Sequence, residues 1–544
     1  MKSEIVNSPQ SEQGSNFEGW KYDRRNYPDG FTLPQLFENN AQAHPDSTAV
    51  VFKGTRLTYQ ELNSRANQLS RYLSEMGVGP EKTVMVSMER SYEVYIALVA
   101  IHKAGGAYVP IEPYNPAGRL KFYADDSQPE VVLTQAALAD RFSDCGKPIF
   151  SIDSDWKLVQ DKSKENLPLS VNEDNLSDVI YTSGSTGLPK GVLSTHRNRM
   201  NALFAWQDIY KLTEKDVLFQ TTSLGFDVFT GDYTRSLCLG ATIVPSEENF
   251  TIAQNASVER MYELLVEEGV TFAEFNVTTI RKLFSYAKAN GKPLDFLKTI
   301  VVGADAWYLT EDTALTDYCQ GKTKVINSYG MTEEAVDSIY FDRSMIPNPN
   351  DPKLSSKSLI GIPFPNSRIY LLDENLQPVE KGEVGTMFFG GPNTARGYLH
   401  REELTEQRFV KNPFLKNSDE KIYNSGDLAR INEHGIMEFL GRADFQIEVG
   451  SKRVEINEVE AAIQKFPSIS EVVVTGIKRE NRDTALVAYI VSHKENATDV
   501  EALSEFLKNE LPGYMVPSII MPLETFPLNA HGKVDRKMLP LPPL

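Results

Sequence analysis

Between about residues 31 and 250, the chain alternates short apolar runs rich in β-branched residues with longer amphipathic segments. Residues 48–52 and 83–88 are apolar runs of strand length. The segment between them, residues 57–78, places apolar side chains at helical spacing, namely Leu62, Ala66, Leu69 and Leu73. Strand-like runs return at residues 269–276, 297–304 and 322–330. Strands that alternate with helices predict parallel βαβ units.

From about Leu359 the pattern changes to short strands separated by turns, which predicts a β-rich subdomain packed on the α/β body. After residues 441–444 a smaller unit of roughly 100 residues follows, within the usual size of a domain. We therefore expect an α/β fold with a large N-terminal core of two βαβ-type subdomains plus a β-rich subdomain, and a small mobile C-terminal α+β lid. The expected divisions are a polar N-terminal tail (1–30), the core (31–443) and the lid (444–544).

Composition narrows the class of protein. The 544 residues carry 56 Lys and Arg against 74 Asp and Glu, a formal charge of -18 that repels a phosphate backbone and disfavours nucleic-acid binding. The three cysteines lie far apart, which fits a reducing cytoplasm better than a disulfide framework or a zinc site. The sequence shows no signal peptide and no apolar run of about 20 residues, so we expect a cytoplasmic chain without a membrane partner.

The strongest chemical signal is the string YTSGSTGLPKG at residues 181–191. Small hydroxyl and glycine residues let backbone N–H groups and side-chain oxygens turn toward phosphate oxygens, and Lys190 adds a counter-charge. No Ser or Thr follows Lys190, so the string is not the GxxxxGK[ST] phosphate loop. It predicts a phosphate-binding turn of another kind.

This string and several later ones resemble adenylate-forming enzymes, more narrowly the adenylation domains of nonribosomal peptide synthetases. The matching motifs are collinear from about residue 31 to 541, at 57–63, 103–116, 327–334, 382–399, 423–430, 441–460, 511–518 and 527–539. The sequence departs from the family at Glu448, where a lysine is common, and at residues 450–453. The resemblance implies an ATP-dependent enzyme that makes an aminoacyl-AMP and pyrophosphate with Mg²⁺. It would then transfer the acyl group to phosphopantetheine on a separate carrier protein.

Carried over by motif, the resemblance implies roles for individual residues. Lys533 would bridge the substrate carboxylate and the ATP α-phosphate, where a cation stabilises the charge that gathers in the transition state. Lys190 and His196 would line the reaction site, Glu333 would bind magnesium, and Asp444 would be the hinge of the lid. Asp427 would accept the ribose hydroxyls, Tyr329 would stack on adenine, and Arg442 would approach the ribose and phosphates. The remaining ATP-binding positions are Thr182, Ser183, Gly184, Ser185, Thr186, Gly187 and Thr332.

Asp227 resembles the family's ligand for the substrate α-ammonium. The implied side-chain pocket comprises Val228, Gly231, Glu274, Val301, Gly303, Ser328, Val336 and Asp337. Two glycines leave room for a long side chain, and Glu274 and Asp337 make the pocket acidic, so a guanidinium is the simplest guest. Arginine is therefore the first expected substrate, tyrosine the second because its hydroxyl can donate to Glu274, and lysine the third.

Two other functions remain open on the sequence. An acyl-CoA or aryl-acid ligase of the same fold would not need Asp227. A catalytically silent nucleotide-binding scaffold would not need Lys190, Glu333, Asp427 and Lys533 together. We favour the adenylation domain, and expect a monomer when this domain is excised.

Overall fold

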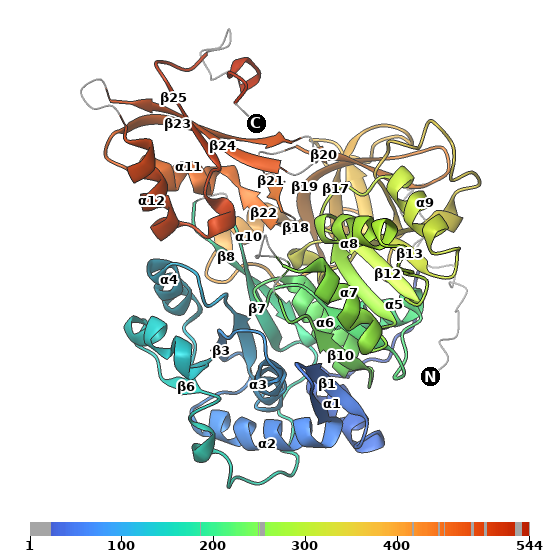
Figure 1. The fold of residues 1–544 in the computed structure, drawn as a ribbon, viewed down its shortest axis with the longest axis vertical. Helices are drawn as coiled ribbons and strands as arrows, with labels where there is room; N and C mark the ends of the chain where they lie inside the picture. The colour runs from blue at the N-terminus through green and yellow to red at the C-terminus, as the bar shows by residue number, and fades with distance from the viewer. Residues whose placement is uncertain are drawn as a thin grey trace.

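The computed structural model describes residues 23–184, 187–248, 250, 256–415, 418–443, 446–450, 452–479, 484–493, 498–527 and 536–542. Predicted sites at Ser185, Thr186, Asp444 and Lys533 lie outside these residues. The described part of the core is built around two large sheets with helices between and around them (Figure 1). This confirms the expected α/β class.

The first sheet has the strand order β6-β5-β3-β4-β7-β8. Neighbouring strands pair in parallel from β6 to β7, and β8 closes one edge antiparallel to β7. The bounds are β3 Thr83–Val86, β4 Ala107–Pro110, β5 Val131–Thr134, β6 Ile149–Ser151, β7 Leu176–Thr182 and β8 Lys190–Thr195. The predicted phosphate loop is therefore the connection between two paired strands.

The second sheet has the order β16-β17-β19-β20-β15-β14-β13-β12-β11-β9-β10-β1-β2, with β18 beside β19. Its α/β part comprises β1 Thr48–Phe52, β2 Thr55–Thr58, β9 Val217–Gln220, β10 Thr242–Pro245, β11 Phe272–Asn276, β12 Thr299–Gly303, β13 Lys324–Tyr329 and β14 Ile339–Asp342. The remaining strands are β15 Leu359–Pro363, β16 Arg368–Leu372, β17 Gly385–Gly390, β18 Phe409–Lys411, β19 Lys421–Ile431 and β20 Met437–Arg442.

The β-rich stretch predicted from about Leu359 is present, and its strands are continuous with the second sheet. Strand β15 pairs antiparallel with both β14 and β20, so the later strands continue the second sheet. Pairing β15 along β14 satisfies backbone groups that a free sheet edge would leave exposed. The continuity links the strand that ends at Tyr329 with the strand that carries Asp427.

The core helices are α1 Leu33–Ala43, α2 Tyr59–Glu75, α3 Tyr92–Lys103, α4 Ala117–Ser127, α5 His196–Tyr210, α6 Asp227–Leu237, α7 Val258–Glu267, α8 Val277–Ala289, α9 Leu309–Tyr318 and α10 Glu402–Arg408. Helix α2 confirms the helix predicted over 57–78, and a capping box between Thr58 and Glu61 fixes its start. Helix α3 contacts β1 of one sheet and β3 and β4 of the other. This position explains why nearly every residue of α3 is apolar and buried.

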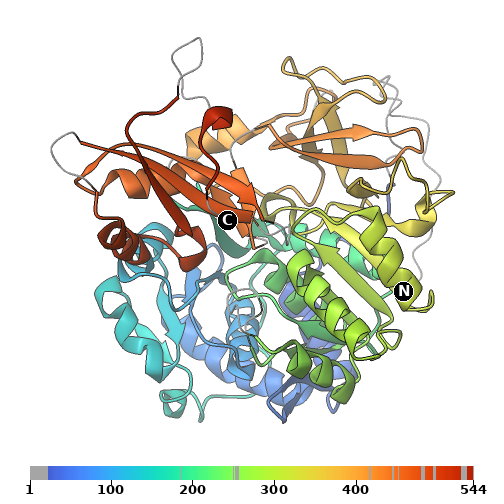
Figure 2. The ribbon, with the colours of Figure 1, turned by 45° about the horizontal axis from the view of Figure 1, so that its top comes forward.

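The C-terminal elements have their own sheets and core. A hairpin of β21 Gln446–Val449 and β22 Lys452–Glu455 precedes a three-stranded sheet of β23 Ile469–Lys478, β24 Thr484–Ser492 and β25 Ile519–Leu523. Helices α11 Ile456–Gln464 and α12 Val500–Glu510 pack against each other, and α12 also contacts α4 of the core (Figure 2). Val454, Ile463 and Leu507 belong to a buried apolar cluster of this unit alone.

Part of the predicted N-terminal tail packs on the core. The backbone of Arg25 donates to Asn366 Oδ1 at 2.8 Å, and the Tyr27 hydroxyl donates to Asp208 at 3.1 Å. Gly30 N donates to Glu173 at 2.9 Å. The described residues 23–30 are therefore an ordered strap rather than a free tail, because their polar backbone groups find partners on the core surface.

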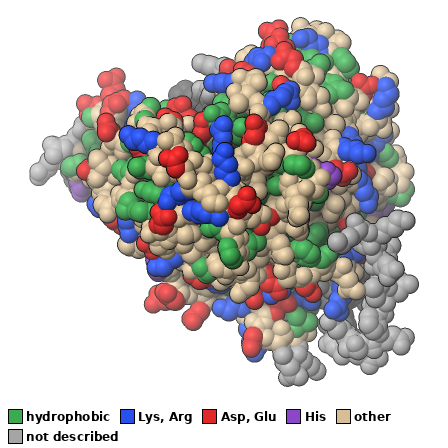
Figure 3. Space-filling model, turned by 90° about the horizontal axis from the view of Figure 1, so that it is seen from below, with side chains coloured by type: hydrophobic (Ala, Val, Ile, Leu, Met, Phe, Trp, Pro, Cys, Tyr) green, Lys and Arg blue, Asp and Glu red, His purple; other side chains and the backbone are tan. Residues whose placement is uncertain are grey.

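The surface and the cysteines add two observations. Acidic and basic side chains are interspersed over the face in Figure 3, and the three cysteines are buried and unpaired. Among the described residues, no helix combines the length and hydrophobicity needed to cross a bilayer.

Candidate active site

The predicted phosphate loop is a tight turn that touches the lid. A Cβ atom on Gly184 would lie 1.8 Å from the carbonyl oxygen of Leu188, so this position requires glycine. The Ser183 hydroxyl donates to the carbonyl of Arg453 at 3.0 Å, and Gly184 N donates to Glu458 at 3.1 Å. The Thr182 hydroxyl is buried without a hydrogen-bond partner in the described structure. The loop thus joins the strand hairpin of the core to β22 and α11.

Glu333 is the centre of a buried charge cluster beside this loop. It lies in the single helical turn Thr332–Glu334 and is fully buried. Lys190 Nζ lies 3.4 Å from one carboxylate oxygen, and Arg453 Nη1 from the lid lies 3.2 Å from the other. The Tyr398 hydroxyl donates to Glu333 at 2.8 Å and accepts from Lys190 Nζ at 3.1 Å. Sequence reasoning assigned Glu333 and Lys190 but missed Tyr398 and Arg453, although both stand inside the matched motifs.

For Glu333 and for Lys190, burial and the neighbouring charges shift the pKa in opposite directions. Burial alone would raise the pKa of Glu333, but Arg453 and Lys190 hold it well below its usual range. Burial lowers the pKa of Lys190 to about 8, although Glu333 opposes this shift. Glu333 is therefore an anion at neutral pH, the form that a hard divalent cation requires. The described residues contain no group of three or more candidate metal ligands, so phosphates and water would supply the other oxygens for magnesium.

The predicted ribose and adenine residues come together on interior strands of the second sheet. Asp427 on β19 stands opposite Arg442 on β20 and forms an ion pair with it. The hydroxyl of Tyr329, at the end of β13, donates to the other oxygen of Asp427. The Tyr329 ring stacks near Phe389, with 6.2 Å between the ring centroids. The structure therefore places the Asp427 carboxylate next to the Tyr329 side chain.

Asp227 begins helix α6 and faces the Glu333 turn. One carboxylate oxygen accepts from Val228 N at 2.8 Å, and the other accepts from the hydroxyl of Thr332 at 2.8 Å. A carboxylate at the first turn of a helix is favoured by the helix dipole. Thr332, which the resemblance assigned to ATP, therefore links the candidate amine ligand to the candidate metal ligand.

The predicted side-chain pocket is built by α6 and by the ends of three neighbouring strands. Asp227 and Gly231 are four residues apart on one face of α6. Glu274 on β11 pairs in register with Val301 on β12, and Gly303 ends that strand. The other members are Val228, Ser328, Val336 and Asp337, all buried or half-buried.

The same helix face carries a residue that sequence reasoning missed. Arg235 lies four residues beyond Gly231, is fully buried, and pairs with Glu274 and with Asp232, the latter at 2.9 Å. Its other terminal nitrogen lies 3.7 Å from Asp337. The expectation that Glu274 and Asp337 wait unpaired for a substrate cation is therefore wrong. The spacing 227, 231, 235 was a signal that could have revealed this arginine.

The two pocket glycines, Gly231 and Gly303, are confined by different neighbours. A Cβ on Gly231 would lie 3.5 Å from Arg235 Nη2 and from the Trp206 ring, so Arg235 borders the space that this glycine leaves. A Cβ on Gly303 would lie 3.1 Å from the Ser328 carbonyl oxygen, which makes Gly303 a site of close approach between strands. The pocket is therefore shorter than two glycines suggested.

His196 does not join the Glu333 cluster. Its ring is fully buried at the start of α5, packs 5.4 Å from the His102 ring, and accepts from Leu33 N at 3.4 Å. Burial holds the pKa of His196 well below its usual range, so the ring is neutral. This environment assigns His196 to the packing between α1, α3 and α5.

We expect Glu274 to make stability depend on pH. Burial raises the pKa of Glu274 to about 8, although Arg235 opposes this, and Asp337 and Asp232 add to the rise. The folded state then binds more protons than the unfolded state between pH 4.5 and 8, so stability falls as pH rises through that window, by about 1.4 kcal/mol per pH unit at most. Urea unfolding of the Glu274→Gln variant across this window should show a flatter dependence than the original chain. An equally steep dependence would contradict the assignment.

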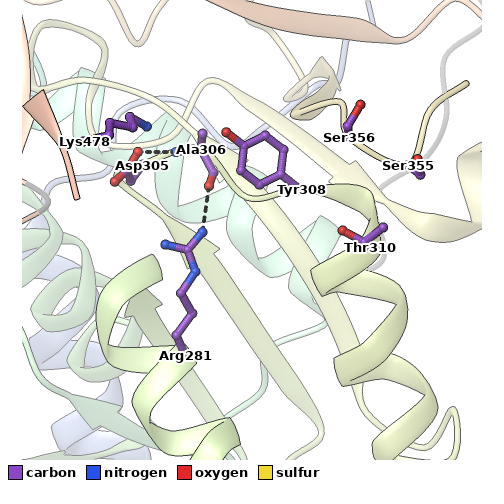
Figure 4. A pocket seen from close by; sticks show the side chains of 8 residues that line it. All are labelled: Arg281, Asp305, Ala306, Tyr308, Thr310, Ser355, Ser356 and Lys478. Atoms are coloured by element: carbon purple, nitrogen blue, oxygen red, sulfur yellow. Dashed lines mark hydrogen bonds between the residues drawn. The ribbon is translucent and has the colours of Figure 1, made fainter. Parts of the chain in front are cut away.

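Two of the cavities at the junction of core and lid lie near predicted or basic residues. One, of about 620 Å³, is lined by Glu112 and Phe226 of the core and by Lys452 and Tyr514 of the lid. The other, of about 390 Å³, is lined by the eight residues labelled in Figure 4, including Arg281 of α8 and Lys478 of β23. In that second cavity Arg281 is already paired with Glu311 at 2.7 Å. The first cavity is lined by Phe226, the residue that precedes Asp227 in the sequence.

The sequence matches two known family models and several known proteins. Residues 37–399 match the model of the AMP-binding enzyme family, and residues 458–533 match that of the AMP-binding enzyme C-terminal domain. The chain is 37% identical over 519 residues to tyrocidine synthase 3 of Brevibacillus parabrevis, covering 95% of this chain and 8% of that protein. It is 36% identical to bacitracin synthase 2 of Bacillus licheniformis, covering 95% of this chain and 19% of that protein. The chain thus spans a small part of these much longer relatives.

Solved structures agree on the fold. An artificially fused adenylation–PCP di-domain from Klebsiella oxytoca superposes with a TM-score of 0.79 at 21% identity, covering 91% of this chain and 86% of that chain. The o-succinylbenzoate CoA synthetase of Bacillus subtilis also gives 0.79 at 21% identity, covering 94% and 98%. The nonribosomal peptide synthetase FmoA3 gives 0.69 at 31% identity, covering 76% and 43%. The chain therefore belongs to the AMP-binding enzyme family, and these matches support an ATP-dependent, AMP-forming ligase.

Proposed function

We propose that this chain is an amino-acid adenylation domain of a nonribosomal peptide synthetase. A carboxylate oxygen of the amino acid attacks the α-phosphorus of ATP, and the bond to pyrophosphate breaks with its electron pair leaving on pyrophosphate. The thiol of phosphopantetheine on a separate carrier protein then attacks the acyl carbon, loses its proton and releases AMP. The cavity of about 620 Å³ between core and lid, beside Phe226, supports an approach for that thiol.

The observation that carries the proposal is the position of Asp227. Its carboxylate is held at the start of α6 by Val228 N and by Thr332, the neighbour of Glu333 in sequence. A substrate ammonium paired with Asp227 would keep the attached carboxylate close to the Lys190 and Glu333 cluster. A ligase for acids without an α-amine has no use for a buried carboxylate there, because an unpaired buried charge destabilises the complex.

The charges around the phosphate loop support in-line transfer between two anions. Lys190 offers a positive charge to the triphosphate, and Lys533 is proposed to bring another to the junction of the two substrates. Magnesium held by Glu333 would neutralise phosphate charge when bound. Asp427 and Tyr329 would orient the nucleoside, so the chain contributes mainly positioning and electrostatics.

The lid is proposed to turn about Asp444 between the two reactions. In this structure β22 brings Arg453 to Glu333, and α11 brings Glu458 to both Gly184 and Arg119 of α4. These contacts cross the cleft and must break for another face of the lid to enter. Arg453 thus competes with a metal ion for Glu333.

The side chain of the substrate is the finer part of the proposal. The sequence favours arginine because Glu274 and Asp337 are two acidic side chains that a substrate cation would neutralise. Arg235 already neutralises part of this negative charge. The hydroxyl of a tyrosine substrate would still donate a hydrogen bond to Glu274. The substrate is therefore proposed to be an amino acid with a polar side chain that donates a hydrogen bond into the pocket.

A second candidate, an acyl-CoA or aryl-acid ligase, draws support from the equal TM-scores of the CoA synthetase and the adenylation di-domain. The discriminating experiment is ATP–pyrophosphate exchange with the twenty amino acids, set against benzoate, succinate and fatty acids. Exchange that depends on an amino acid supports our proposal. Exchange with acids that lack an α-amine supports the second candidate, and no exchange with any acid would favour a silent scaffold.

We expect Glu333→Gln to raise the magnesium requirement of exchange and to lower its rate at least about tenfold, because an amide is a weaker ligand than a carboxylate for a hard cation. Chelation by EDTA should stop exchange by the original chain, and added magnesium should restore it. The matched control is Glu334→Gln: burial keeps the pKa of Glu334 far above its usual range, so that side chain is already uncharged. Identical magnesium titrations for the Glu333 variant and the original chain would contradict the role of Glu333.

A further inference from the structure

Arg235 is the least expected feature of the side-chain pocket. Its Nη2 and Nε atoms donate to one oxygen of Asp232 at 2.9 Å and 3.2 Å, and Nη2 also pairs with Glu274 Oε2. Three carboxylates, those of Asp232, Glu274 and Asp337, therefore face one guanidinium. This arrangement is a built ion cluster rather than a chance surface pair, because all four side chains are buried.

Aromatic rings hold Arg235 in place. Its guanidinium carbon lies 5.0 Å from the Trp206 ring and 5.2 Å from the Phe272 ring. Asp337 is meanwhile satisfied by the Trp206 indole N–H at 2.7 Å and by the Ser328 hydroxyl at 2.5 Å. Arg235 cannot swing away to admit a substrate guanidinium without leaving these contacts.

The ion cluster around Arg235 leaves a few polar atoms that a substrate side chain could contact. Glu274 Oε2 is taken by Arg235, whereas Oε1 lies 3.9 Å from the position of a Cβ on Gly303, toward the pocket. Within the described structure, Asp232 Oδ2 and Arg235 Nη1 are buried without a hydrogen-bond partner. A guanidinium guest needs two adjacent oxygens of one carboxylate for its bidentate geometry, and Glu274 no longer offers two. A donor that makes single contacts suits the remaining oxygen.

We propose that Arg235 is a specificity-determining residue that occupies the place of a substrate guanidinium, so that the pocket selects a side chain ending in an aliphatic ammonium. This inference rests on the proposed function. Burial raises the pKa of Glu274 to about 8, but Asp232 and Asp337 still outnumber the one guanidinium by one formal negative charge. A compact cation neutralises that charge and a phenol does not. Because Arg235 borders the space over Gly231, the guest is also shorter than arginine. The substrate class is then an L-diamino acid.

The first experiment uses the original chain. The kcat/KM of pyrophosphate exchange is measured for L-diamino acids whose side chains have one to four methylene groups, and for arginine, tyrosine and norleucine. We expect one diamino acid to exceed arginine and tyrosine at least about tenfold, and norleucine at least about a hundredfold. A higher value for arginine or for tyrosine than for every diamino acid would overturn the inference.

The second experiment tests Arg235 itself. Arg235→Ala frees both oxygens of Glu274 and opens space, so the ratio of arginine to the best diamino acid should rise at least about tenfold. A double variant, Asp232→Asn with Arg235→Ala, lowers the charge imbalance in case the single variant fails to fold. Lys103→Met is the matched control, because Lys103 of α3 is a buried cation paired with Glu38 of α1. That control should leave the ratio unchanged.

The outcomes separate the two levels of the proposal. If the folded original chain gives no exchange with any amino acid, the proposed function fails. If amino acids support exchange and a folded Arg235 variant keeps the original ratio, only the role of Arg235 fails. A structural defect alone would lower all rates together and would not shift the ratio.

Discussion

Replacing Lys533 with alanine is expected to lower amino-acid-dependent pyrophosphate exchange about a hundredfold to a thousandfold, with the fold intact. Adenylation joins a carboxylate to a triphosphate, and a cation at their junction stabilises the charge that gathers in the transition state. The loss should appear mainly in kcat, since the contact strengthens in the transition state. Steady-state exchange measures the rate, and circular dichroism with thermal unfolding reports the fold.

Two controls make the Lys533 prediction specific. Lys508→Ala removes a lid lysine that is exposed and pairs only with Glu505 among the described residues, and it should leave exchange unchanged. Transfer from a preformed aminoacyl-AMP to a carrier thiol should also survive in the Lys533 variant, because we propose that this step uses another face of the lid. Turnover like that of the original chain would reject the catalytic assignment of Lys533.

Replacing Asp227 with alanine should lower kcat/KM for amino acids at least about a hundredfold, because removing one partner of a buried ion pair costs about 3–5 kcal/mol. The affinity for ATP should change less than kcat/KM does, since among the described residues the side chain of Asp227 hydrogen-bonds with only one predicted ATP-binding position, Thr332, and with none in the phosphate loop. Exchange kinetics measure the first quantity, and nucleotide titration the second.

A substrate analogue tests whether the Asp227 effect arises from the amine. The des-amino analogue of the best amino acid should be a poor substrate of the original chain and should lose nothing further in Asp227→Ala. Thr332→Val removes the hydrogen bond to Asp227 but keeps the carboxylate, so it should lower kcat/KM for amino acids less than Asp227→Ala does. Nucleotide titration of this variant reports separately on the predicted contact of Thr332 with ATP. If the variant lost the amino acid and its des-amino analogue equally, Asp227 would not bind the ammonium.

Local sequence patterns predicted many of the helices and strands. The helix at 59–75 follows from apolar spacing and a capping box, and the parallel strands follow from short β-branched runs between helices. The turn at residues 181–191 is recognisable in the sequence from its small hydroxyl and glycine residues, and the structure shows that Gly184 has no room for a side chain. These features depend on residues close together in the chain.

Other features depend on which distant segments meet. The continuation of the second sheet through β15 is a pairing choice, and short antiparallel strands carry no local mark of their partner. The ordering of residues 23–30 requires Asn366 and Asp208, which lie far along the chain. His196 stands in a matching motif, yet its surroundings come from α1 and α3.

The sequence by itself determined the order of the elements and, through its motifs, singled out the turn at residues 181–191 and the candidate residues Lys190, Glu333 and Asp227. Only the tertiary structure decided the charge balance of the substrate pocket. Arg235 of α6 reaches Glu274 on β11 and Asp337 between β13 and β14, and these three segments lie far apart in the sequence. The electrostatic state of a buried group depends on all the charges around it, and these come from segments that only folding brings together.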